Sequence, residues 1–301
     1  MNTARSLPTC RAFGTFTALW RWLVEQHLWI GLCAVALVYA THRFALHIQE
    51  PLWSAEYLIA FTGAFIAYRS QELHTLWSEM SSPLHRSVRF VQPWTLISRY
   101  PSCMALIVLT WAVFQMGIQR ATLYLPAGII TVLYLFPLHP SIFVRRLPFA
   151  KIFLISACWT WITATTPLAL HGTPLLEAVV HPISWERFAF IFALTVPFDI
   201  RDMEEDARAG LKTLPNILGS KVTKITGIFA VCLWVGLHYV AMGDTHYTDG
   251  TFLATVLAAI PTIGLILWSH PLQSELYFTG YVDGMMLVWV VLMEALHNIL
   301  A

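Results

Sequence analysis

Three aspartates in the second half of the chain have a spacing that suits metal-assisted phosphate chemistry. Asp199, Asp202 and Asp206 are separated by three and then four residues. On a helix, this spacing places the three side chains on one face, where they repel one another unless a positive group lies between them. Mg²⁺ prefers oxygen ligands and commonly binds one or two carboxylates together with substrate phosphates. The spacing predicts an Mg²⁺ site that holds a diphosphate. The alternative is a solvated helix end whose acids pair with Arg201 and Arg208.

Positively charged residues flank this acidic run and suit a phosphate ligand. Lys212 follows Gly210, which allows a flexible turn immediately after the acids. Lys151, Arg145 and Arg146 lie before an apolar run and are expected at the same aqueous boundary. These cations favour phosphate binding over a merely solvated surface.

The composition indicates that these charged groups belong to a protein embedded in a membrane. Of the 301 residues, 57% are hydrophobic and only 12% are charged, against about 25% charged in a typical soluble domain. The mean hydropathy is +0.63. These values predict an all-α integral membrane protein forming a single domain over residues 1–301. They exclude a secreted disulfide scaffold, a disordered chain and a basic nucleic-acid binder.

Nine apolar runs are long enough to be membrane spans, each of which needs roughly 20 mostly apolar residues. All but three of the 18 Lys and Arg residues (Arg43, Arg120 and Arg187 are the exceptions) fall on one side of this arrangement. The positive-inside rule then places residues 1–21 in the cytosol and the C-terminus outside, in a cell membrane such as a bacterial inner membrane. The predicted spans are Trp22–Ala45, Trp53–Leu73, Cys103–Gln119, Thr122–Leu138, Ile152–Leu170, Phe188–Met203, Val222–Val240, Thr251–Trp268 and Tyr277–Leu300.

The acidic run and its surroundings resemble the second aspartate motif of the UbiA superfamily of intramembrane prenyltransferases. Residues 147–151, which open the fifth predicted span, are similar to the Tyr-Pro-x-x-Lys stretch of that family. The acidic motif also lies in the sixth of nine predicted spans, where the family places it. The matching positions are Arg201, Asp202, Asp206, Gly210, Thr213, Leu214, Pro215, Leu218 and Gly219.

This resemblance implies a nine-helix bundle whose central cavity opens to the cytosol. An isoprenyl diphosphate would be held through Mg²⁺, and its loss of diphosphate would give a carbocation that a hydrophobic acceptor captures. Asp202 and Asp206 are then the catalytic candidates, and both join Asp199 as metal ligands. The expected substrate-binding residues include Lys151 and Lys212, with Arg201 beside them.

The first aspartate motif of the family, Asn-x-x-x-Asp-x-x-x-Asp, is degenerate in this chain. No aspartate precedes Asp199. Aligning the expected asparagine with Tyr68 places Glu72 at the first aspartate and Leu76 at the second. Glu72 is therefore a candidate metal ligand, and Arg69 is a candidate for direct contact with the diphosphate in place of a metal ion.

The sequence is also compatible with other functions. A terpene cyclase would use the same ionisation but capture the carbocation with the isoprenoid's own alkene. A non-catalytic isoprenoid-binding protein would explain the missing first motif. A transporter is disfavoured because few charged residues fall at mid-membrane depth.

Two further kinds of polar residue need an interpretation. Asp283, near the start of the last predicted span, is a candidate substrate-binding residue because ionisable groups inside membrane helices are commonly functional. It is equally well explained as an acid at a helix N-terminus. The 12 histidines show no HxxxH or HExxH spacing, so each is interpreted as a polar cap or interface residue.

Overall fold

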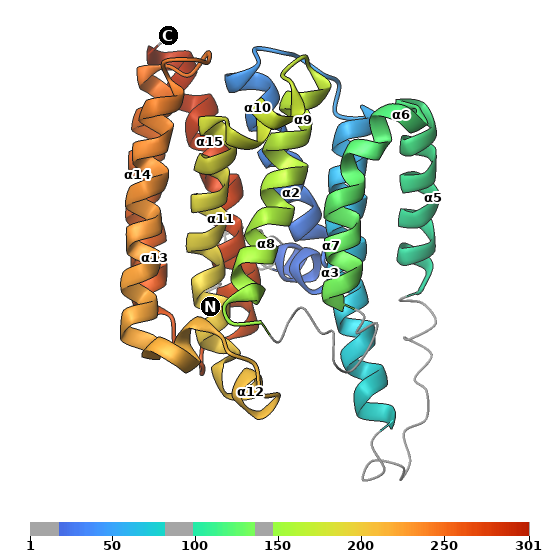
Figure 1. Ribbon diagram of the computed structural model, residues 1–301, viewed down its shortest axis with the longest axis vertical. Helices are drawn as coiled ribbons and strands as arrows, with labels where there is room; N and C mark the ends of the chain where they lie inside the picture. Colours follow the sequence, from blue (N-terminus) through green and yellow to red (C-terminus); the bar gives the residue numbers. More distant parts are fainter. Residues whose placement is uncertain (1–17, 82–98, 136–146, 301) are drawn as a thin grey trace, which may run out of the picture.

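The computed structural model describes residues 18–81, 99–135 and 147–300. The predicted cytosolic residues 1–17 and the cations Arg145 and Arg146 lie outside these ranges, as does the side chain of Glu72. Within the described ranges the secondary structure is helical, without strands, as the apolar runs predict. The long helices lie side by side and run along the vertical axis of Figure 1.

The helices follow one another in this order: α2 (Leu28–Ala40), η1 (Thr41–Ala45), α3 (Ala55–Ser81), α5 (Arg99–Met116), α6 (Ile118–Ala121), η3 (Thr122–Tyr124), α7 (Leu125–Leu135), α8 (Ala150–Thr160), η5 (Trp161–Thr165), α9 (Thr166–Leu170), α10 (Leu175–Val180), α11 (Pro182–Arg201), α12 (Met203–Arg208), α13 (Leu214–Ala241), α14 (Asp249–Trp268), η6 (Leu276–Val282) and α15 (Asp283–Leu300). The segments η1, η5 and η6 are π-helical.

Five described helices are long and apolar enough to cross a membrane. They are Leu28–Ala45, Ala150–Leu170, Leu214–Ala241, Asp249–Trp268 and Leu276–Ile299. A sixth candidate is the pair Pro101–Met116 and Ile118–Tyr134, which is bent by 117° at its break. The predicted spans 53–73 and 188–203 lie mostly in α3 and α11, which are not among these candidates. The number of nine spans therefore stays a prediction.

The outer surface of the bundle is apolar, as a lipid environment requires. Phe114 is 84% exposed, Phe229 is 67% exposed and Ile225 is 64% exposed. Large exposed apolar surfaces are rare on soluble monomers and mark contact with another apolar phase. Helices are suited to that phase because they satisfy their backbone hydrogen bonds internally. The chain is thus a multi-pass membrane protein.

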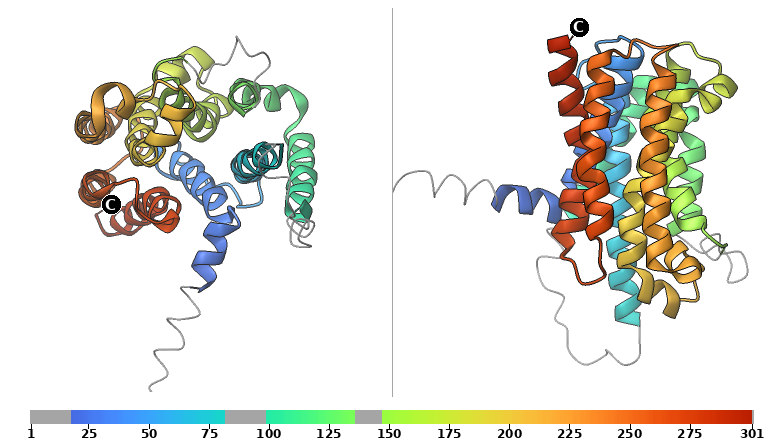
Figure 2. Two further views of the ribbon diagram at one scale, coloured as in Figure 1. Left: turned by 90° about the horizontal axis from the view of Figure 1, so that it is seen from below. Right: turned by 90° about the vertical axis from the view of Figure 1, so that its left-hand side faces the viewer.

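Helix α11 lies in the interior and positions the groups of interest. It packs against α8, α13 and α14, and Figure 2 shows the bundle from two further sides. In its middle, Phe190 stacks on Trp234 of α13 with ring centroids 4.2 Å apart, and Trp289 of α15 meets both rings edge-on. These fully buried aromatic rings contribute a large apolar area with defined mutual geometry. The interior of the bundle is therefore densely packed around α11.

The widened helical turns η1 and η5 are joined through a buried arginine. Thr41 donates from Oγ1 to the Thr163 carbonyl at 2.7 Å. Arg187 of α11 donates to the Thr163 carbonyl at 3.5 Å and to Thr41 Oγ1 at 3.4 Å, and its guanidinium lies 5.2 Å from the ring of Trp289. A buried charge is tolerated when hydrogen bonds and an aromatic face compensate it. Arg187 thus fixes the relative positions of η1 and η5.

Candidate functional site

The acidic residues lie where α11 ends and α12 begins. Asp199 is in the last turn of α11, and Asp202 (φ −83°, ψ 0°) separates the two helices. The expectation of one continuous helical face is wrong, because the helix breaks at Asp202. The side chains still converge: the backbone N–H of Asp206 donates to the Asp202 carbonyl at 2.8 Å, and this turn directs Asp206 inward. Glu204 and Glu205 are exposed instead.

Lys151 reaches the acidic residues from the first turn of α8. Phe149, the residue immediately before α8, caps this helix with a left-handed backbone conformation (φ 62°). Its N–H donates to the Lys212 carbonyl at 2.9 Å. This backbone contact holds the start of α8 against the segment after α12, so the side chain of Lys151 points at the acids.

The ammonium of Lys151 lies between all three carboxylates, which we call the acidic cluster (Asp199, Asp202 and Asp206). Its Nζ is 2.7 Å from Asp202 Oδ2, 2.9 Å from Asp206 Oδ2 and 3.6 Å from Asp199 Oδ1. Lys151, Asp199 and Asp206 are buried. The structure therefore supplies the positive group that the spacing of the aspartates requires.

Arg201 provides a second cation at the edge of the cluster. Its Nε donates to Asp202 Oδ1 at 2.7 Å, and one terminal nitrogen donates to Glu275 at 3.1 Å. The guanidinium lies 5.1 Å from the ring centroid of Phe198 and 5.2 Å from that of Phe278. Lys151 and Arg201 thus contact both carboxylate oxygens of Asp202.

The acidic cluster fits a divalent cation. Lys151 lies near all three carboxylates, and Arg201 pairs with Asp202. Both oxygens of Asp199 are buried and accept no hydrogen bond. A buried carboxylate without hydrogen bonds is costly, and oxygen atoms are the ligands that hard divalent cations prefer. Asp199, Asp202 and Asp206 could therefore hold such an ion.

The structure places the other predicted site residues as follows. Arg69 is buried in α3, and Asp283 is buried at the start of α15. Lys212 has an exposed side chain and joins the site only through its backbone. Glu72 lies in α3. Lys151 and Arg201 directly contact the acidic cluster.

Sequence reasoning missed the residues that hold Arg201. Glu275 is 74 positions away along the chain, and Phe278 follows it at the start of the π-helical segment η6. No local spacing links these residues to the aspartates. Only the packing of α11 against η6 brings them together.

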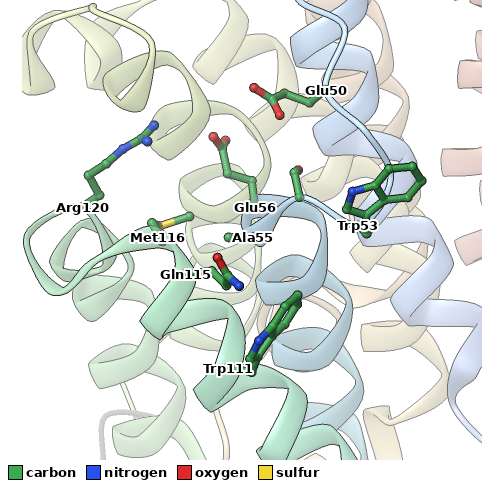
Figure 3. A pocket seen from close by; sticks show the side chains of 9 residues that line it. Glu50, Trp53, Ala55, Glu56, Trp111, Gln115, Met116 and Arg120 are labelled. Carbon is green, nitrogen blue, oxygen red and sulfur yellow. The ribbon is translucent and has the colours of Figure 1, made fainter.

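Two surface hollows are distinct from the acidic cluster. One, with a volume of about 430 Å³, lies at the opposite end of the bundle beside Glu56 and Arg120 (Figure 3). The other, of about 460 Å³, lies beside Lys224 and Trp268. Neither is lined by the acidic cluster, so the central cavity that opens to the cytosol stays a prediction.

Comparisons with known proteins agree on one family. The sequence model of the UbiA prenyltransferase family matches residues 98–290, which include the acidic cluster and Lys151. No curated protein matches the chain significantly in sequence.

Solved structures resemble the whole described bundle. A UbiA homologue from Aeropyrum pernix K1 has a TM-score of 0.62 and 12% sequence identity, covering 91% of this chain and 97% of its own. A structure of digeranylgeranylglyceryl phosphate synthase has a TM-score of 0.55 and 13% identity, covering 92% of this chain and 96% of its own. At such low identity these similarities establish the fold alone.

Proposed function

Because the chain belongs to the UbiA prenyltransferase family, we propose that it transfers a prenyl group from an isoprenyl diphosphate to a lipid-soluble acceptor. The observation that carries this proposal is the convergence of Asp199, Asp202 and Asp206 on Lys151. We further propose Mg²⁺ as the divalent ion, because it is the ion most commonly held by carboxylates together with phosphates.

Each residue of the cluster has a distinct role in this proposal. Asp202 and Asp206 hold the ion and the diphosphate in position, and Asp199 contributes the oxygens that now accept no hydrogen bond. When bound, Mg²⁺ would stabilise the negative charge that grows on the leaving diphosphate. Lys151, which lies among the three carboxylates, would add positive charge beside the phosphate oxygens. Arg201 keeps Asp202 ionised and oriented.

The reaction that these groups support is the exchange of one bond to the prenyl carbon for another. The bond between the allylic carbon and the bridging oxygen breaks, and the electron pair leaves with the diphosphate. The resulting allylic cation accepts an electron pair from the acceptor, which then loses a proton to solvent or to the released diphosphate. The low-dielectric interior would strengthen the attraction between the Lys151 ammonium and the leaving diphosphate.

The degenerate first motif leaves two candidate groups on α3, Arg69 and Glu72. Arg69 is buried in α3, and a guanidinium can bind a phosphate through two parallel hydrogen bonds. We propose that it contacts the diphosphate directly, so that fewer metal ligands are needed on α3. Glu72 is the remaining carboxylate of that motif and is proposed as a ligand of the ion. Lys212 and Asp283 are proposed at the edge of the substrate site.

The proposal also assigns a membrane orientation. The acidic cluster lies at the end of the bundle that carries α12 (Figure 1). The excess of Lys and Arg in the predicted inner segments supports placing this end in the cytosol, where a water-soluble diphosphate head group can enter. The N-terminus would then be cytosolic and the C-terminus external.

A non-catalytic isoprenoid-binding protein is the second candidate. Its support is specific: no aspartate precedes Asp199 in the sequence, so the first metal motif of the family is incomplete. A terpene cyclase differs only in the group that captures the cation.

One experiment separates these functions. Purified protein in lipid nanodiscs is incubated with isoprenyl diphosphates of different chain length, beginning with geranylgeranyl diphosphate, and with a membrane lipid extract as acceptor. We expect release of inorganic diphosphate that requires Mg²⁺ and stops with EDTA, together with a prenylated product detected by mass spectrometry. A cyclised hydrocarbon would identify a cyclase, and release of no diphosphate would favour the non-catalytic protein.

A further inference from the structure

A second cluster of chemically capable residues lies at the opposite end of the bundle. His42 Nε2 is 2.9 Å from Glu56 Oε2, and His171 Nε2 is 3.0 Å from Glu56 Oε1. We call these three residues the histidine cluster. One ligand atom from each lies within 4.8 Å of the other two. His42 and His171 are far apart in sequence, and the fold brings both to the same carboxylate.

The residues of the histidine cluster come from three different elements. His42 is in η1, Glu56 is in the first turn of α3, and His171 is the C-terminal cap of α9. The segment η5, which leads into α9, is tied to η1 by the hydrogen bond from Thr41 to the Thr163 carbonyl. The two histidines thus approach the same carboxylate from elements that are themselves linked.

The chemistry of the cluster suits a transition metal better than Mg²⁺. Two imidazoles and one carboxylate are a common ligand set of catalytic zinc sites, which keep a fourth position open. His42 Nδ1 lies 3.1 Å from the Tyr57 hydroxyl, and metal-bound histidines are usually oriented by such a contact through their second nitrogen. His42 is fully buried, and the side chains of Glu56 and His171 are only 7% and 15% exposed.

The open side of the cluster meets a surface hollow. Glu56 is one of the residues that line the hollow of about 430 Å³, and Glu50 and Arg120 line it as well. Figure 3 shows the Glu56 carboxylate between the side chains of Glu50 and Arg120. A water molecule or a small anionic ligand entering this hollow can therefore complete the coordination of an ion held by Glu56.

We propose that His42, Glu56 and His171 bind one Zn²⁺ ion at this end of the bundle, with a fourth position open to the hollow. On binding, each histidine presents a neutral Nε2 lone pair to the metal, and any proton on these nitrogens is released to solvent. The ion would replace the two hydrogen bonds to Glu56 and would join η1, α3 and α9. This site is separate from the acidic cluster and does not depend on the proposed prenyl transfer.

The test is metal titration of the intact protein without a polyhistidine tag, in nanodiscs and after treatment with a chelator. With millimolar Mg²⁺ present to occupy carboxylate sites, we expect one Zn²⁺ per chain by calorimetry. We also expect Co²⁺ to give the visible absorption bands of a nitrogen-ligated site. His171→Gln keeps a hydrogen-bond donor near Glu56 but should weaken Zn²⁺ binding by at least about 100-fold, and Tyr57→Phe by about 10-fold.

Two controls make the result decisive. His270→Gln alters an exposed histidine elsewhere on the bundle, and Asp206→Asn alters the acidic cluster; both should bind Zn²⁺ like the wild type. Size-exclusion chromatography confirms that every variant is folded. Absence of stoichiometric binding, or binding lost in Asp206→Asn but kept in His171→Gln, would overturn the proposal.

Discussion

Asp206→Asn is expected to lower the rate of prenyl transfer by at least about 100-fold. The substitution keeps the size of the side chain but removes a negative charge 2.9 Å from Lys151 Nζ, and with it one ligand of the proposed Mg²⁺ ion. Loss of one preorganised electrostatic contact in an active site commonly costs about 100- to 1,000-fold in rate. The measurement is release of inorganic diphosphate from an isoprenyl diphosphate at saturating Mg²⁺.

Glu204→Gln is the matched control for this variant. Glu204 lies two residues before Asp206 in α12 and carries the same charge, but its side chain is 72% exposed and pairs with Arg208. The control should retain wild-type activity. Equal activity of Asp206→Asn and wild type would show that the acidic cluster does not take part in the reaction.

Lys151→Met is expected to destabilise the protein when no divalent ion is present. The methionine fills similar space but leaves three carboxylates facing one another, two of them buried. Removing one partner of a buried ion pair typically costs about 3–5 kcal/mol. The measurement is the thermal unfolding midpoint in detergent with EDTA, which should fall clearly below that of the wild type.

Added Mg²⁺ should restore much of the stability of Lys151→Met, because the ion replaces the missing ammonium. The rise in the midpoint on Mg²⁺ addition should be larger in this variant than in the wild type, where Lys151 competes for the same carboxylates. Lys212→Met is the control, since its side chain is exposed and its loss should change neither value. An Mg²⁺ response no larger than that of the wild type would contradict a metal site at the acidic cluster.

The helical class, the membrane environment and the acidic cluster could be predicted from sequence because each depends on local pattern. Long apolar runs require helices in lipid, and the spacing of Asp199, Asp202 and Asp206 brings them close in any helical conformation. The sequence also predicted that a cation must lie near these acids. It did not place Lys151 at their centre, because that contact depends on how the start of α8 is anchored to the Lys212 carbonyl.

The remaining features depend on contacts between segments far apart in the chain. The partner of Arg201, Glu275, lies on a different helical segment. The histidine cluster joins Glu56 to His171 across 115 positions. It is positioned by the π-helical turns η1 and η5, which the residue pattern did not predict. Spacing rules describe single elements, so they could not detect sites assembled by packing.

The central claim is that the acidic cluster holds a diphosphate through a divalent ion, and equilibrium binding tests it most directly. The measurement is the affinity of a non-reactive isoprenyl thiodiphosphate for the wild-type protein in nanodiscs, with Mg²⁺ and with EDTA. We expect saturable binding that weakens by at least about 10-fold without Mg²⁺, as for loss of a supporting metal contact. Equal affinity with and without the ion would contradict the claim.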